Sequence, residues 1–182
     1  MVQSLSFKHL ALVVLFVSLC GFCNAQSGGY GEIFIGSAKQ KDTGLSYGSD
    51  SSFGFWAGMP ITDAIAAEIG YANYGGPTLT DGFDVFGVET TAVNLGARFQ
   101  LPIDSRIGVH ARFGIAFWDF ELTGPGVSGS LDDSDFYWGL GADYRISESS
   151  SLVLDYHSLS CKASGVGSLD VTNFSLGIGF DF

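Results

Sequence analysis

The sequence predicts an all-β protein, an eight-stranded antiparallel up-and-down barrel that crosses a membrane. The last twelve residues, VTNFSLGIGFDF, alternate between large apolar side chains at even positions and small or polar ones at odd positions, which is the period of a β-strand. Similar runs recur after residue 25, each near the roughly 9–11 residues that a tilted transmembrane strand needs. The connections between them are alternately short and long, as in outer-membrane barrels.

A secretory signal peptide is predicted at residues 1–25, which leaves one barrel domain at residues 26–182. The segment has Lys8, an apolar run from Leu10 to Phe22 and a small exit residue, Ala25, in the order typical of a cleaved signal. The alternative is a transmembrane helix, but the run is shorter than the roughly 20 apolar residues such a helix needs.

Eight alternating runs follow the predicted signal. The first is Gly-rich and alternates weakly; from the fourth onward the pattern is clear, as in RIGVHARFGIAF, where Gly, His and Arg alternate with Ile, Val, Ala and Phe. The predicted strands cover residues 29–38, 51–61, 64–75, 90–101, 106–121, 134–147, 151–161 and 171–182.

The connections predict which rim of the barrel faces outward. Residues 60–63, 102–105 and 148–150 form tight turns, whereas the polar, Gly-rich segments 38–50, 76–89, 123–133 and 162–170 are expected to be long loops. The tight turns share a rim with both ends of the barrel, and short turns are periplasmic in this class of protein. The four long, acidic loops would then be extracellular.

Charge and cysteine content argue against a nucleic-acid-binding protein and against a disulfide-linked scaffold. The formal net charge of −11 repels phosphate backbones and argues against a nucleic-acid partner. Cys161 is the only cysteine after the predicted signal, so no internal disulfide is expected. A soluble lipocalin-like barrel, with its apolar face inward, is the alternative fold.

The chain resembles the OmpA-like eight-stranded outer-membrane barrels, the group of opacity-type surface antigens. The resembling stretches are AVNLGARFQLPIDSRIGVHARFGIAFW, GLGADYRISESSSLVLDYHS and NFSLGIGFDF, and the resemblance spans residues 27–182. It implies the outer membrane of a Gram-negative bacterium, contact with lipid and lipopolysaccharide, and Phe182 as the terminal signal read by the barrel-assembly machinery. Because the sequence stops at Phe182, the second, cell-wall-binding domain of larger members is not expected.

Parity places a set of ionisable side chains in the lumen. Eight strands enclose only enough space for side chains to fill, and unpaired buried charges are costly. The set is therefore expected to form a salt-bridged plug; a gated polar path for protons or small ions is the alternative. The predicted lumenal residues are Glu32, Glu68, Arg98, His110, Arg112, Asp143, Arg145, Asp155 and His157.

No catalytic residue, metal ligand or cofactor site is predicted. His157 and Ser158 face opposite sides of a strand, which disfavours a serine–histidine pair. The acidic run 131–135 lacks the glycine and the distant glutamate of a helix-loop-helix calcium site. The expected function is structural or surface-interacting, with a possible surface ligand at the loops; a narrow porin-like channel is the alternative.

Overall fold

The computed structural model describes residues 28–42, 45–76, 78–81, 84–124, 127–163 and 167–182. The predicted signal peptide lies outside these residues. No helix among them is long and apolar enough to cross a membrane. The strands of the described part are β1 (Tyr30–Asp42), β2 (Leu45–Thr62), β3 (Ile65–Asn73), β4 (Thr78–Asp81), β5 (Asp84–Pro102), β6 (Ile107–Gly124), β7 (Val127–Ser147), β8 (Ser150–Ala163) and β9 (Gly167–Asp181).

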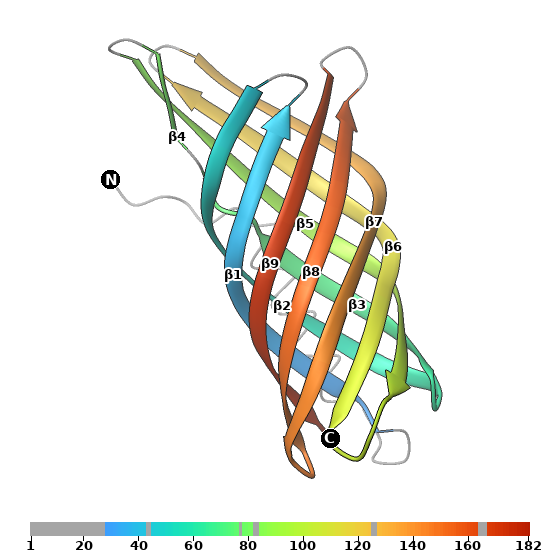
Figure 1. The fold of residues 1–182 in the computed structure, drawn as a ribbon. Helices are drawn as coiled ribbons and strands as arrows, with labels where there is room; N and C mark the ends of the chain where they lie inside the picture. Colours follow the sequence, from blue (N-terminus) through green and yellow to red (C-terminus); the bar gives the residue numbers. More distant parts are fainter. Residues whose placement is uncertain (1–27, 43–44, 77, 82–83, 125–126, 164–166) are drawn as a thin grey trace.

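The strands form one closed antiparallel ring (Figure 1). The hydrogen-bonded order is β3-β2-β1-β9-β8-β7-β6-β5-β4, and β3 also pairs with β5. Because β3 and β4 both pair with β5, they occupy one position in the wall and the ring has eight strands. Between them Gly75 has φ of +76°, a conformation that glycine adopts without strain. The predicted fold class is confirmed.

The three tight turns lie where the sequence predicts them. β2–β3, β5–β6 and β7–β8 are joined at residues 63–64, 103–106 and 148–149, on the rim that also holds Phe182 (Figure 1). In the central turn, the Asp104 carboxylate accepts hydrogen bonds from the backbone N–H groups of Arg106 and Ile107, at 2.7 and 2.8 Å. These two bonds lower the pKa of Asp104 below its ordinary value because they favour the ionised form.

The prediction of four long loops is wrong for most of their residues. β1 continues to Asp42, β6 to Gly124 and β8 to Ala163, so that paired strands extend far toward the opposite rim. Backbone hydrogen bonds hold these extensions whatever the polarity of the side chains. Apolar alternation ends earlier, because outside the hydrocarbon neither face has to be apolar.

The outer wall carries the apolar side chains. Ile35, Ile33, Phe136 and Leu140 are among the many large residues more than half exposed, as required of a surface solvated by lipid. The interior follows the opposite parity and is filled by polar, charged and aromatic groups.

Three large aromatic side chains, one Phe and two Trp, lie inside the barrel. Phe34, Trp56 and Trp118 are buried in the lumen. A lumen of eight strands has to be filled by side chains, and inward glycines give the rings room. A Cβ on Gly70 would strike the Trp56 ring, and a Cβ on Gly58 would strike the Tyr30 ring.

Candidate functional site: the charged lumen

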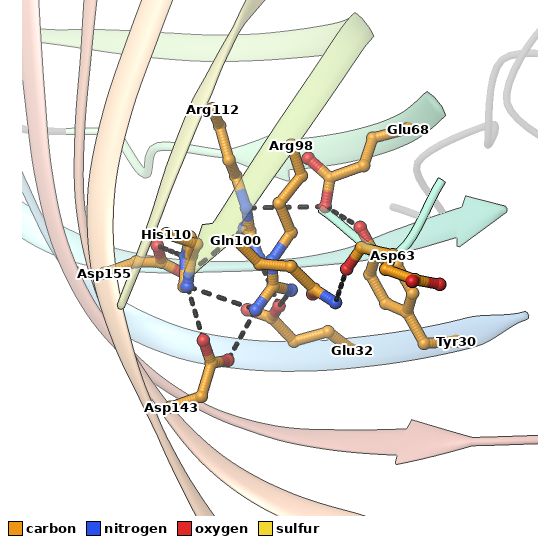
Figure 2. A network of polar contacts seen from close by, with 10 residues as sticks. All are labelled: Tyr30, Glu32, Asp63, Glu68, Arg98, Gln100, His110, Arg112, Asp143 and Asp155. Atoms are coloured by element: carbon orange, nitrogen blue, oxygen red, sulfur yellow. Dashed lines mark hydrogen bonds and ion pairs between the residues drawn. The ribbon is translucent and has the colours of Figure 1, made fainter. Parts of the chain in front are cut away.

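Seven ionisable side chains meet in one layer of the lumen, which we call the charged layer (Figure 2). They come from β1, β3, β5, β6, β7 and β8, and inward parity on each strand brings them to the barrel axis. The charged layer consists of Glu32, Glu68, Arg98, His110, Arg112, Asp143 and Asp155.

Arg112 is the centre of the charged layer. Its guanidinium donates a hydrogen bond to Glu32 and lies 3.2 Å from Asp155 and 3.4 Å from Glu68. The guanidinium carbon also lies 4.7 Å from the centroid of the Trp56 ring, close enough for a cation–π contact. Arg112 therefore neutralises carboxylates from three strands, β1, β3 and β8.

The second half of the charged layer is built on Arg98 and His110. Arg98 donates to Asp143 at 2.5 Å and lies 3.7 Å from Glu32. His110 Nδ1 is 2.7 Å from Asp143, and Nε2 is 2.8 Å from Asp155. Asp155 and Glu32 each contact both halves, so the charged layer is one connected network.

His110 lies between two carboxylates and a guanidinium. Its Nδ1 faces Asp143 and its Nε2 faces Asp155, and Arg98 Nη2 also lies 3.1 Å from Nδ1. Both ring nitrogens can donate only when the ring is protonated, whereas a hydrogen bond from Arg98 needs Nδ1 as an acceptor. The layer holds four carboxylates against two guanidiniums and one imidazole ring. Glu68 has a further donor, since the Tyr30 hydroxyl donates to it at 2.5 Å.

A second, mostly apolar layer lies on the side of the charged layer away from the turns. We call it the upper lumen. His157 packs there against the rings of Trp56 and Tyr137, and its Nδ1 is 3.0 Å from the Tyr74 hydroxyl. The buried apolar cluster of the upper lumen comprises Phe34, Ala38, Trp56, Ala72, Tyr74, Ala92, Ala116, Trp118, Tyr137, Leu159, Cys161 and Val171.

Cavities on the two sides of the charged layer differ greatly. An open vestibule of about 270 Å³ on the side of the turns reaches Glu32, Arg98 and Asp143. The cavity that reaches Arg112 and His157 from the other side is about 10 Å³, space for about one water molecule.

Two predicted lumenal residues stand apart from the charged layer. Arg145 is exposed and lines the vestibule, and its side chain makes no ion pair within the described part of the chain. His157 is buried in the upper lumen instead. Ser158 has a more exposed environment than His157, consistent with opposite faces of β8.

Sequence reasoning missed the aromatic part of the lumen. Tyr30, Trp56, Tyr74 and Tyr137 all contact charged or histidine side chains there. Each has inward parity, so the strand period could have found them.

Phe182 lies at the seam between the first and last strands. Its backbone exchanges two hydrogen bonds with Gly29, at 2.8 and 2.9 Å, and its side chain is 61% exposed. A Cβ on Gly29 would come within 2.9 Å of the Phe182 ring. The assembly-signal role of Phe182 stays a prediction.

No group of three or more His, Cys, Asp or Glu residues suited to a metal ion occurs among the described residues. The carboxylates of the charged layer are instead occupied by arginine and histidine donors.

Several solved outer-membrane barrels share the fold. Neisserial surface protein A superposes with a TM-score of 0.70 at 14% identity, over 86% of this chain and all of that one (100%). The attachment invasion locus protein Ail of Yersinia pestis superposes with a TM-score of 0.62 at 14% identity, over 86% of this chain and 99% of that one. OprG of Pseudomonas aeruginosa superposes with a TM-score of 0.56 at 16% identity, over 86% of this chain and 97% of that one.

Comparison of sequences gives the family. No curated protein matches the chain in sequence. The family model described as the outer membrane protein beta-barrel domain matches residues 10–182, nearly the whole chain. The protein therefore belongs to the outer membrane protein beta-barrel domain family and resides in the outer membrane of a Gram-negative bacterium.

Proposed function

We propose that the protein is a sealed barrel with a structural and surface-interacting role, which anchors strand extensions on the extracellular side of the outer membrane. The observation that carries the proposal is the two-layered lumen. The vestibule ends at a network of paired charges. Beyond it lies the upper lumen, where an apolar cluster packs beside buried polar side chains such as Gln40 and Asn173, and where the cavity next to Arg112 and His157 is about 10 Å³.

The two layers oppose permeation for different physical reasons. Opening the charged layer would separate Arg112 from carboxylates on three strands, and breaking a buried ion pair is costly. Even with those pairs broken, the packed side chains of Leu159, Val171 and Ala116 would still fill the upper lumen. A solute would therefore have to displace both layers, which are in contact where Arg112 lies over the Trp56 ring.

The alternative of a narrow channel has one observation in its favour. Several buried polar atoms have no hydrogen-bond partner in the described part of the chain, including Glu32 Oε1, Glu68 Oε2, Tyr137 Oη and His157 Nε2. Ordered water can satisfy such atoms, and a chain of waters could carry protons past the charged layer.

Planar-bilayer conductance distinguishes the two functions. The wild type should show no stable open state, and Arg98→Ala with Arg112→Ala should remain closed because every side chain of the upper lumen is still present. Long-lived wild-type openings would contradict the sealed barrel. A proton flux in vesicles that disappears in His157→Phe would support the water chain instead.

A role in surface interaction is probed separately. The extensions are rich in carboxylates, so a surface ligand is expected to be basic or bridged by cations. Cells that carry the barrel with shortened β6–β7 extensions should bind such a ligand less than wild-type cells, at equal amounts of barrel in the membrane. Equal binding would remove these extensions from the proposed role.

A further inference from the structure

The mouth of the vestibule carries charges of opposite sign on opposite sides of the ring. We infer that the vestibule binds a short peptide with a free carboxylate and a free ammonium group, which enters from the rim of tight turns. That rim faces the periplasm in barrels of this class. The site lies below the charged layer, so it goes beyond the sealed barrel of the proposed function and does not depend on it.

Two arginines form the cationic side of the mouth. Arg106 ends the turn between β5 and β6, Arg145 lies near the end of β7, and both line the vestibule. They are neighbours, because the backbone N–H of Arg145 donates to the Arg106 carbonyl at 2.7 Å. Neither guanidinium forms an ion pair within the described part of the chain. Adjacent guanidiniums with free N–H groups suit a carboxylate ligand.

Two carboxylates form the anionic side of the mouth. Asp181 lies at the end of β9, Asp63 lies in the turn between β2 and β3, and both line the vestibule. β1 lies between β9 and β2 in the ring, and β6 lies four strands from β1 in either direction. The carboxylates are therefore across the mouth from the arginines. Neither forms an ion pair among the residues that the structure describes, so both are available to an ammonium group.

The floor of the vestibule has a buried donor and a buried acceptor that are unused. Arg98 and Glu32 line the vestibule and are 6% and 2% exposed. Arg98 Nε and Glu32 Oε1 have no hydrogen-bond partner in the described ranges of the chain. Buried polar atoms are rarely left unsatisfied. A peptide group has one C=O acceptor and one N–H donor, and these are the two partners that the floor lacks.

The dimensions of the vestibule fit a peptide of about two residues. Its volume of about 270 Å³ is just below the roughly 300–1,000 Å³ typical of small-molecule sites. β8 separates β7 from β9, so the strands that carry Arg145 and Asp181 are about 10 Å apart. An extended dipeptide spans about 7 Å, and the long arginine side chain covers the remaining distance.

NMR titration of the barrel in a non-ionic detergent tests the inference with L-alanyl-L-alanine as the probe. The amide signals of Ser151 and Gly179, which line the vestibule, should shift and reach saturation. The N-acetylated dipeptide lacks the ammonium group and the dipeptide amide lacks the carboxylate. Each should bind at least about threefold more weakly, because each has lost one exposed ion pair.

Variants assign each end of the dipeptide to one side of the mouth. Arg106→Gln/Arg145→Gln should weaken binding of the dipeptide at least about fivefold, because two charge-assisted contacts are lost. The same variant should bind the dipeptide amide as the wild type does, since that probe has no carboxylate to lose. Asp181→Asn should weaken binding of the dipeptide but not of its N-acetylated form.

The matched controls remove the same charges elsewhere. Lys39→Gln/Lys41→Gln removes two positive charges from the far end of β1, and Glu148→Gln removes a carboxylate from the turn between β7 and β8. Both should bind the dipeptide as the wild type does, and all variants should keep heat-modifiable migration as evidence of folding. If the double arginine variant does not fold, Arg145→Gln alone should still weaken binding.

The stereochemistry of the probe identifies the source of the peptide. Tighter binding of D-alanyl-D-alanine assigns the site to cell-wall peptides, tighter binding of the L,L form assigns it to peptides cut from proteins, and equal binding assigns it to both. Three outcomes would overturn the inference. They are the absence of a saturable shift, equal losses for the dipeptide and its amide in the arginine variant, and tighter binding of glycerophosphoethanolamine than of either dipeptide. The last result would assign the charges to a phospholipid headgroup.

Discussion

Arg112 is the residue on which the interior depends most. It contacts Glu32, Glu68 and Asp155, and its removal leaves buried carboxylates without their main counter-charge. We expect Arg112→Ala to lower the free energy of unfolding by about 3–5 kcal/mol, measured by urea unfolding in micelles.

Arg145→Ala is the matched control, because Arg145 has the same parity but is exposed at the vestibule. Its effect should stay within about 0.5 kcal/mol. Equal losses for both variants would mean that charge pairing in the lumen contributes nothing specific.

The substitution Gly70→Ala tests how closely an aromatic ring packs against the backbone of an inward-facing glycine. Adding a methyl group there drives it into the Trp56 ring, and overpacking of this kind costs about 1–3 kcal/mol. Gly70→Ala should therefore unfold at a lower urea concentration, and Trp56→Leu should relieve part of the loss in the double variant. Gly129→Ala, with nothing within 4 Å of the new Cβ, should behave as wild type.

At the scale of elements, the turn at residues 103–106 makes a prediction about pH. Two backbone donors lower the pKa of Asp104, so NMR titration of the folded barrel should give a midpoint below the ordinary value of about 3.9. The stabilisation is fully present above the ordinary pKa and is lost as the pH falls through the lowered one. In an unfolded peptide of the same sequence, Asp104 should titrate with its ordinary pKa. An equal midpoint in the barrel and in the peptide would contradict the stabilisation of the Asp104 carboxylate by its two backbone hydrogen bonds.

The sequence predicts the elements well in the membrane and poorly beyond it. In β6, alternation from Ile107 to Phe117 reveals strand, parity and turn together, because lipid imposes an apolar face. A loop was expected from residue 123 to residue 133, yet β6 continues to Gly124 and β7 begins at Val127, although no such force acts on the side chains there. Pairing with β5 on one side and with β7 on the other keeps this end of β6 extended.

Strand parity predicts which ionisable residues face the lumen, but it does not predict which of them pair with one another. Strand period places His110 inside, whereas the approach of Asp143 and Asp155 to its two ring nitrogens depends on the register of β6, β7 and β8. The position of Trp56 cannot be predicted from residue type, because an apolar ring that could face lipid instead fills the lumen over Gly70.

At the scale of the whole molecule, the orientation of the wall can be tested with its three tryptophans. Trp138 is 42% exposed on the outer face, while Trp56 and Trp118 are each 4% exposed in the lumen. Lipids brominated in their acyl chains should quench the fluorescence of Trp138 almost alone. Trp138→Phe should lose most of the quenching and Trp56→Phe should keep it; the reverse would place the apolar face inside.

The pairing of β1 with β9 also constrains how the protein can be made. Thirteen register pairs, from Tyr30↔Asp181 to Asp42↔Leu169, join the parts of the barrel that are farthest apart in sequence. Until β9 is synthesised, both margins of the growing sheet expose free backbone groups that readily recruit foreign strands. Contacts so distant along the chain also form slowly. A premature stop before residue 167 would yield a polypeptide prone to aggregate rather than a smaller barrel.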